Sequence, residues 1–229
     1  MTTLTTRKEI VTTKRIIGSE LAKMQQAFYD EEILQFYKED DEEHLYWEMY
    51  DCFHNEYMDY PSFNKVIGLN HADIGTFTNK LSKRLTLLFQ SIKATEFVII
   101  SYSKLDFFGN RNHDFKPLQE AYKKLEAIVG DKTFKEAFTT DIDSLPDFIE
   151  IFFWITRCDS SAPEFIFIFD KDEKIQISLC KYGNIHLTEH GKEELTADKL
   201  EALGWTIIEG PEFDNFSDEG RIEGRQIEV

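Results

Sequence analysis

The first 95 residues carry their apolar side chains mostly at the three- and four-residue spacing of helices. Ser19 is a candidate N-cap for a first helix. A second helix is expected over residues 41–60, with Pro61 at its end. The N-terminal part of the chain is therefore predicted to be helical.

A third helix is predicted from a cap at Asn70 or Asp73 to about residue 94. Its core-facing stripe comprises Ile74, Phe77, Leu81, Leu85, Leu88 and Ile92. Residues 97–102 follow as an uninterrupted apolar run, which predicts a buried strand.

Two more helices are expected in the middle of the chain. Pro117 occupies the favoured first position of one helix, and Gly130 closes it. Ser144 can cap another helix that runs through residue 156 and is apolar nearly all round. A helix with so few polar positions has to be buried on most sides.

From residue 164 the apolar pattern changes from helical to alternating. Residues 164–169 and 174–180 are predicted to be two strands joined by a polar turn, and a tight turn leads to a third strand from residue 185. The sequence therefore predicts a three-stranded antiparallel meander. A short helix after Thr196 and a last strand over residues 205–208 complete the pattern.

These elements predict the α+β class, with a helical N-terminal part followed by an antiparallel β-meander with flanking helices. One domain is expected over residues 1–209, divided into a helical part (1–95) and a mixed part (96–209). Residues 210–229 are expected to form an acidic flexible tail.

The charge of the chain is unevenly distributed. The net charge is −17, and residues 30–60 contain twelve acidic side chains against Lys38 alone. Such a field attracts a basic protein partner and speeds encounter. Direct nucleic-acid binding is not expected, because it rests on Lys and Arg side chains that this segment lacks. The alternative is a solvated helix face that only maintains solubility.

The predicted partner-binding surface combines carboxylates with aromatic anchors. Its members are Glu39, Asp40, Asp41, Glu42, Glu43, Glu48 and Asp51, with Tyr46, Trp47 or Tyr50 as anchors where they are exposed.

One short motif, His186-Leu-Thr-Glu189-His190, fits the H-x-x-E-H pattern of a zinc-peptidase class. That chemistry needs both histidines on one face of a helix. Here the surrounding residues alternate as in a strand, which would separate residues 186 and 190 by about 13 Å at ~3.3 Å per residue. A metal site at this motif is therefore not expected.

A second His and carboxylate cluster consists of His44, Glu48, Asp51 and His54, near Cys52. On a helix, residues 44, 48 and 51 would share one side, as in the metal sites of helical bundles. The other helices supply no matching Glu-x-x-His pair, so neither a metal nor a cofactor is expected here.

Catalytic and targeting signals are weak. The sequence has no G-x-S-x-G elbow, no glycine-rich phosphate loop and no Cys-x-x-Cys pair among its three cysteines. No run of 18 apolar residues and no signal-peptide pattern occur, so a cytoplasmic protein without a membrane segment is expected. No catalytic residue is assigned.

A series of short motifs covers about residues 175–216: Gly183-Asn184-Ile-His-Leu187, Leu195-Thr-Ala-Asp-Lys-Leu200, Leu203-Gly204-Trp205, Pro211 and Asn215-Phe216. In these motifs the C-terminal part resembles bacterial YbjN-like and type III secretion chaperone-like domains. It implies a noncatalytic fold of antiparallel strands and helices that binds other proteins.

The expected function is that of a noncatalytic protein-binding module, either chaperone-like or a toxin-immunity-type inhibitor, that acts through its acidic surface. Two alternatives stay open. One is a metal-dependent hydrolase that uses a His and carboxylate cluster, and the other is a structural protein. The sequence does not fix the oligomeric state.

Overall fold

The computed structural model describes residues 1–71, 73–131, 133–212, 214 and 216. The fold is α+β, as predicted. Its eight-stranded sheet has the order β1-β4-β3-β5-β6-β7-β2-β8, and all neighbouring strands are antiparallel. The strands are β1 (Thr3–Thr5), β2 (Ser62–Gly68), β3 (Glu96–Ser101), β4 (Ala137–Asp141), β5 (Ile166–Asp170), β6 (Ile175–Leu179), β7 (Ile185–His190) and β8 (Thr206–Ile207).

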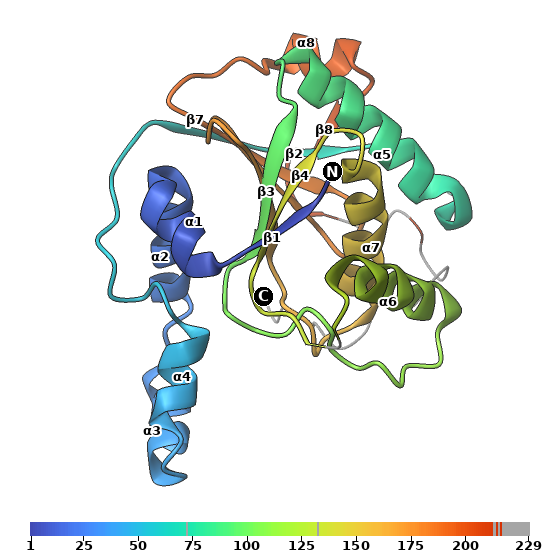
Figure 1. Ribbon diagram of the computed structural model, residues 1–229. Helices are drawn as coiled ribbons and strands as arrows, with labels where there is room; N and C mark the ends of the chain where they lie inside the picture. The colour runs from blue at the N-terminus through green and yellow to red at the C-terminus, as the bar shows by residue number, and fades with distance from the viewer. Residues whose placement is uncertain (72, 132, 213, 215, 217–229) are drawn as a thin grey trace.

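Helices cover both faces of this sheet (Figure 1). The helices of the described residues are α1 (Arg7–Thr13), α2 (Arg15–Ala27), α3 (Glu31–Glu39), α4 (Glu43–Met49), α5 (Ile74–Ser91), α6 (Lys116–Val129), α7 (Leu145–Cys158) and α8 (Ala197–Ala202). Helices α5, α6 and α7 pack on one face, and α1 and α2 pack on the other. The α3–α4 hairpin extends away from both layers.

The central strands are buried on both sides. In β3, Phe97 and Ile99 contact the core under α5–α7, whereas Val98 and Ile100 contact the smaller core under α1 and α2. Two buried faces explain the uninterrupted apolar run of this strand. In strand β6 apolar and polar residues alternate instead, because polar side chains such as Gln176 occupy its second face.

Several predicted elements are confirmed. Helix α5 begins after Asp73, whose carboxylate accepts a hydrogen bond from the Gly75 amide. Helix α6 starts with Pro117 in its first turn and ends at Gly130 in the left-handed conformation (φ 72°). Strands β5, β6 and β7 form the predicted meander.

The predicted helical part differs from the structure in two ways. It contains the strands β1 and β2, and the helix expected over residues 41–60 is only α4, which ends at Met49. Beyond it, contacts from distant residues hold the backbone in turns, since the Gln25 side chain accepts a hydrogen bond from the Cys52 amide. Tertiary contacts therefore override the helical spacing of the apolar residues.

The helix predicted to start at a Ser19 cap is also capped differently from the prediction. Helix α2 begins at Arg15, and the Glu173 carboxylate from the β5–β6 turn accepts hydrogen bonds from the Ile16 and Ile17 amides. Ser19 lies inside the helix, where its hydroxyl accepts a hydrogen bond from the Met58 amide.

Packing extends past residue 209, where the predicted tail begins. Asp214 pairs with the buried Arg157 of α7, and Phe216 is 3% exposed and packs against Phe77. The described residues from 211 to 216 thus belong to the folded body. Residues 217–229 of the predicted tail lie outside the described residues. Within the described part of the chain, no helix is long and apolar enough to cross a bilayer.

Candidate protein-binding surface

The most acidic part of the chain forms a projecting helical arm, which we define as residues 30–49. Asp30 caps α3 by accepting hydrogen bonds from the Glu32 and Ile33 amides. Asp41, with φ 59°, turns the chain into α4. The arm points away from the sheet at the end of α2 (Figure 1).

Aromatic side chains hold the two helices of the arm together. Tyr46 of α4 is 1% exposed and contacts the ring of Tyr37 of α3, with ring centroids 5.5 Å apart. Trp47 of α4 and Tyr50, which follows the helix, pack against it as well. Burial raises the pKa of Tyr46 and of Tyr50. These contacts bury the apolar surface on the inner side of the hairpin.

A buried polar network fixes the base of the arm to the body. The Arg7 guanidinium donates to both carboxylate oxygens of Asp51 at 2.9 Å and to the Ser101 carbonyl at 2.7 Å. The Gln25 amide donates to Asp51 at 3.2 Å. Burial opposes ionisation of Asp51, but the hydrogen bonds and the charge of Arg7 outweigh it and lower the pKa of this carboxyl.

Two of the predicted contact carboxylates are paired with cations that lie outside the arm. The side chain of Asp51 is 23% exposed and is paired with Arg7. Glu48 lies 3.5 Å from the Lys104 ammonium and 3.9 Å from that of Lys135. The structure thus places Glu48 and Asp51 at the joint between the arm and the body.

The other predicted carboxylates lie at the tip of the arm, exposed to solvent. They are Glu39, Asp40, Asp41, Glu42 and Glu43. Lys38 approaches Glu43 to 3.8 Å, and the Trp47 indole donates to Glu43 at 3.1 Å. Residues 30–43 contain eight acidic side chains and this one lysine, so the tip keeps a strong negative charge.

The predicted aromatic anchors pack largely against other side chains of the same chain. Tyr46 is buried, and Trp47 is half-buried between Phe53 and His54, whose ring centroids lie 5.3 and 4.9 Å away. Trp47 keeps part of its ring accessible. Tyr46 therefore stabilises the hairpin and is not available to a partner.

The structure reveals exposed apolar residues on the arm that the sequence analysis missed. Ile33 and Phe36 of α3 and Leu45 of α4 are exposed, and Phe36 is the most exposed of the three at 65%. On α3, Leu34 faces the hairpin interior while Ile33 and Phe36 face solvent. The clue in the sequence is that α3 carries more apolar positions than one buried stripe requires.

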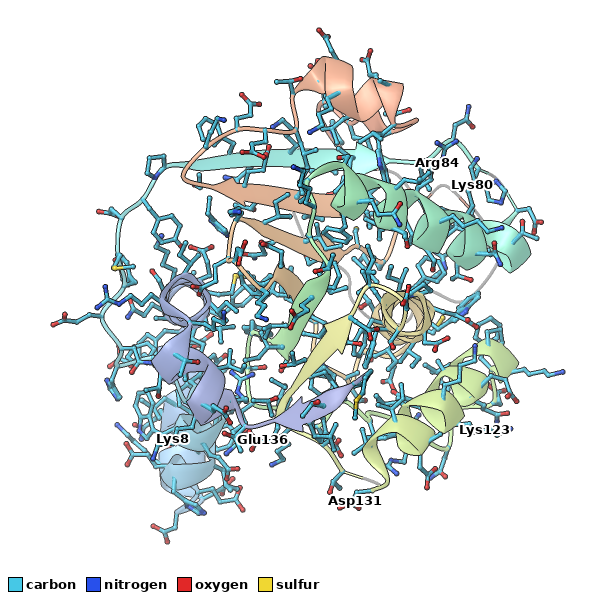
Figure 2. All side chains as sticks on the ribbon, turned by 45° about the horizontal axis from the view of Figure 1, so that its top comes forward. Lys8, Lys80, Arg84, Lys123, Asp131 and Glu136 are labelled. Carbon is cyan, nitrogen blue, oxygen red and sulfur yellow. The ribbon has the colours of Figure 1, made fainter. Side chains whose placement is uncertain are left out.

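Apart from Lys38, the positive charges lie outside the arm. Figure 2 shows Lys80 and Arg84 on α5, across the sheet from the arm, and Lys8 beside Glu136 near the arm's base. Arg84 is partly engaged, since its guanidinium donates to the Leu203 carbonyl at 2.9 Å. The arm and the α5 face thus differ in the sign of their charge.

Neither metal candidate of the sequence is assembled as a group. Helix α4 ends before residue 51, so Asp51 pairs with Arg7 rather than joining His44 and Glu48. His54 stacks on Trp47. The alternative cluster lies on the extended strand β7, where alternate residues point to opposite faces.

The residues of that alternative cluster have separate roles. Glu189 accepts hydrogen bonds from the Glu194 and Leu195 amides and pairs with Lys65. His190 packs between the rings of Tyr60 and Phe169. His186 contacts the Glu212 carboxylate from the C-terminal segment. The residues of the H-x-x-E-H motif therefore lie on a strand and contact different partners, and they do not meet as one group.

No family model, curated protein or solved structure matches this chain.

Proposed function

We propose that this chain is a noncatalytic protein-binding module whose projecting arm captures a basic protein. The observation that supports it best is that the arm exposes three apolar side chains, Ile33, Phe36 and Leu45, together with the carboxylates of residues 30–43. Exposed apolar side chains supply contact area, and acids on the same arm select the charge of the partner.

The joint of the arm supports the same function. A buried arginine, a glutamine and a carboxylate fix the base, so the arm does not need a partner to be held in place. Pre-organised surfaces lose less conformational entropy on binding. A chaperone-like protein or an immunity-type inhibitor that masks a basic surface would use such an arm.

The test compares two arm variants with two matched controls in capture from the native host. The first variant carries Ile33→Ser and Phe36→Ser, and the second reverses Glu39, Asp40, Asp41 and Glu43 to Lys. The controls are Leu87→Ser, an exposed apolar residue of α5, and the reversal of Asp198 and Glu201 on α8.

We expect one basic protein to be captured by the wild type and by both controls, and to be lost from both arm variants. Binding of that purified protein should weaken more than about tenfold in each arm variant. Its association rate should fall as salt is added. Equal capture by arm variants and controls would refute the proposed surface.

A further inference from the structure

A second group of side chains lies at the turn between β6 and β7, far from the arm in the sequence. Ser178 of β6 pairs in register with His186 of β7. Cys180, two residues after Ser178, lies on the same face of the hairpin. The Cys180 amide donates to the Asn184 carbonyl at 2.8 Å, which closes the turn.

Glu212 completes this group from the segment after β8. One Glu212 carboxylate oxygen lies 3.0 Å from Nε2 of His186. The other accepts a hydrogen bond from the Asn184 side-chain amide at 2.9 Å. One ligand atom each from Cys180, His186 and Glu212 lies within 4.8 Å of the other two. A sulfur, a nitrogen and an oxygen donor thus lie close to one another.

The surroundings fix both parts of the group. The Arg157 guanidinium donates to the Lys181 carbonyl in the turn at 2.7 Å and to both Asp214 carboxylate oxygens at 3.0 and 3.1 Å. Phe216 is inserted into the core. A buried arginine therefore connects the hairpin turn to the segment that carries Glu212, which holds the donors near one another before any ion binds.

We propose that Cys180, His186 and Glu212 form a binding site for a thiophilic divalent cation, with Zn²⁺ as the ion that best fits the donors. Thiolate, imidazole and carboxylate are the three ligand types of zinc in proteins, whereas Ca²⁺ and Mg²⁺ select oxygen donors. Thiolate and carboxylate together neutralise the two charges of the ion. Three protein ligands leave a fourth position for water.

The distances between the three donor atoms would have to change only slightly for zinc to bind. Ligand atoms bound tetrahedrally to zinc lie roughly 3.3–3.6 Å apart, given bonds of about 2.0–2.3 Å. The His186 side chain is half-exposed and has room to turn. Asn184 would keep its hydrogen bond to Glu212 and orient the carboxylate, as groups that surround metal ligands do. The bound ion would fasten the C-terminal segment to the β6–β7 hairpin.

The test titrates chelator-treated, full-length protein with Co²⁺, a spectroscopic substitute for Zn²⁺. We expect one equivalent to give a sulfur-to-cobalt charge-transfer band in the near ultraviolet and visible bands of a four-coordinate site, both displaced by one equivalent of Zn²⁺. Cys180→Ser should abolish the charge-transfer band. His186→Gln and Glu212→Gln should weaken binding more than about tenfold.

Two variants serve as matched controls. Cys52→Ser removes a buried thiol that lies outside the group of Cys180, His186 and Glu212, and Glu209→Gln removes an exposed carboxylate near Glu212. Both should bind Co²⁺ like the wild type. Far-ultraviolet circular dichroism establishes that each variant is folded. Zn²⁺ should also raise the melting temperature of the wild type more than that of Cys180→Ser.

The proposal fails if folded wild type shows no charge-transfer band, or if Cys180→Ser retains the band. It also fails if Cys52→Ser loses the band as completely as Cys180→Ser does. None of these three results depends on the partner of the arm, so this test and the capture experiment have independent outcomes.

Discussion

Helix α7 and the α3–α4 arm are both rich in aromatic and aliphatic side chains, but they are covered differently. Helix α7 buries eleven of its fourteen residues between the sheet, α5 and α6. Helix α3 buries only Leu34, and α4 buries only Tyr46. The chain therefore covers the apolar surface of α7 itself and leaves part of the apolar surface of the arm exposed to solvent.

The two regions are also held in place by different kinds of contact. Packing of Phe rings fixes α7, whereas a polar joint of Arg7, Gln25 and Asp51 fixes the base of the arm. Apolar packing stabilises in proportion to the area removed from water. The body is thus built for stability, and the arm contributes little to it.

The sharpest contrast should come from the same substitution in both regions. Phe152 of α7 is 1% exposed and packs against Phe107, Phe138 and Phe148. Phe152→Ala should lower the free energy of unfolding by about 3–5 kcal/mol, because it leaves a cavity in the core. Phe36→Ala should change it by less than about 0.5 kcal/mol.

Equilibrium unfolding in urea measures both values. The slope with urea concentration should be unchanged, so that the midpoints report stability directly. A loss at Phe36 as large as that at Phe152 would show that the arm packs on the body, and would remove the contrast.

The second prediction concerns the joint. Arg7→Met should lower the free energy of unfolding by about 3 kcal/mol, because it leaves the Asp51 carboxylate without its partner. The pKa of Asp51 is lowered in the folded state, so its pairing stabilises above the unfolded pKa of about 3.9 and is lost as the pH falls through the lowered value. The difference between wild type and Arg7→Met should therefore shrink in acid.

Lys8→Met is the control for this joint, since Lys8 is an exposed cation next to Arg7. It should leave the free energy of unfolding almost unchanged. Unfolding curves recorded from neutral pH to about pH 3 provide the measurement. A deficit in Arg7→Met that stays constant over this range would contradict the assignment to the Asp51 pair.

The sequence predicts well those elements whose cause is local. The stripe of α5, the Pro117 and Gly130 boundaries of α6 and the alternation in β6 depend on residues close in the chain. Strand β1 was missed because its three residues pair with β4, more than 130 positions away. The start of α2 was missed because its cap is Glu173 from another turn.

The same distinction between local and distant causes applies to the candidate sites. The acidic run is visible in the sequence, and the structure exposes its carboxylates at the tip of the arm. Helical spacing places Phe36 equally well in a core or on a surface, so its exposure could not be predicted. The approach of Glu212 to Cys180 depends on the fold of the segment after β8 and leaves no pattern in the sequence.

The smallest effect is expected at His190, which is 6% exposed between Tyr60 and Phe169. Among the described residues, neither of its ring nitrogens has a hydrogen-bond partner. Burial lowers its pKa, and Lys23 acts in the same direction, whereas the carboxylates of Glu20 and Asp170 oppose the shift.

The sign of the pH dependence follows from this lowered pKa. Below about pH 6.5 the unfolded chain protonates His190 while the folded chain resists, so the unfolded state binds more protons and stability decreases as the pH is lowered. His190→Phe removes this proton linkage and keeps an aromatic ring in the same place. Between pH 7 and pH 5 the wild type should therefore lose about 1 kcal/mol more than His190→Phe. Urea unfolding at both pH values decides the question: an equal loss in the two proteins would mean that His190 takes up its proton as readily folded as unfolded.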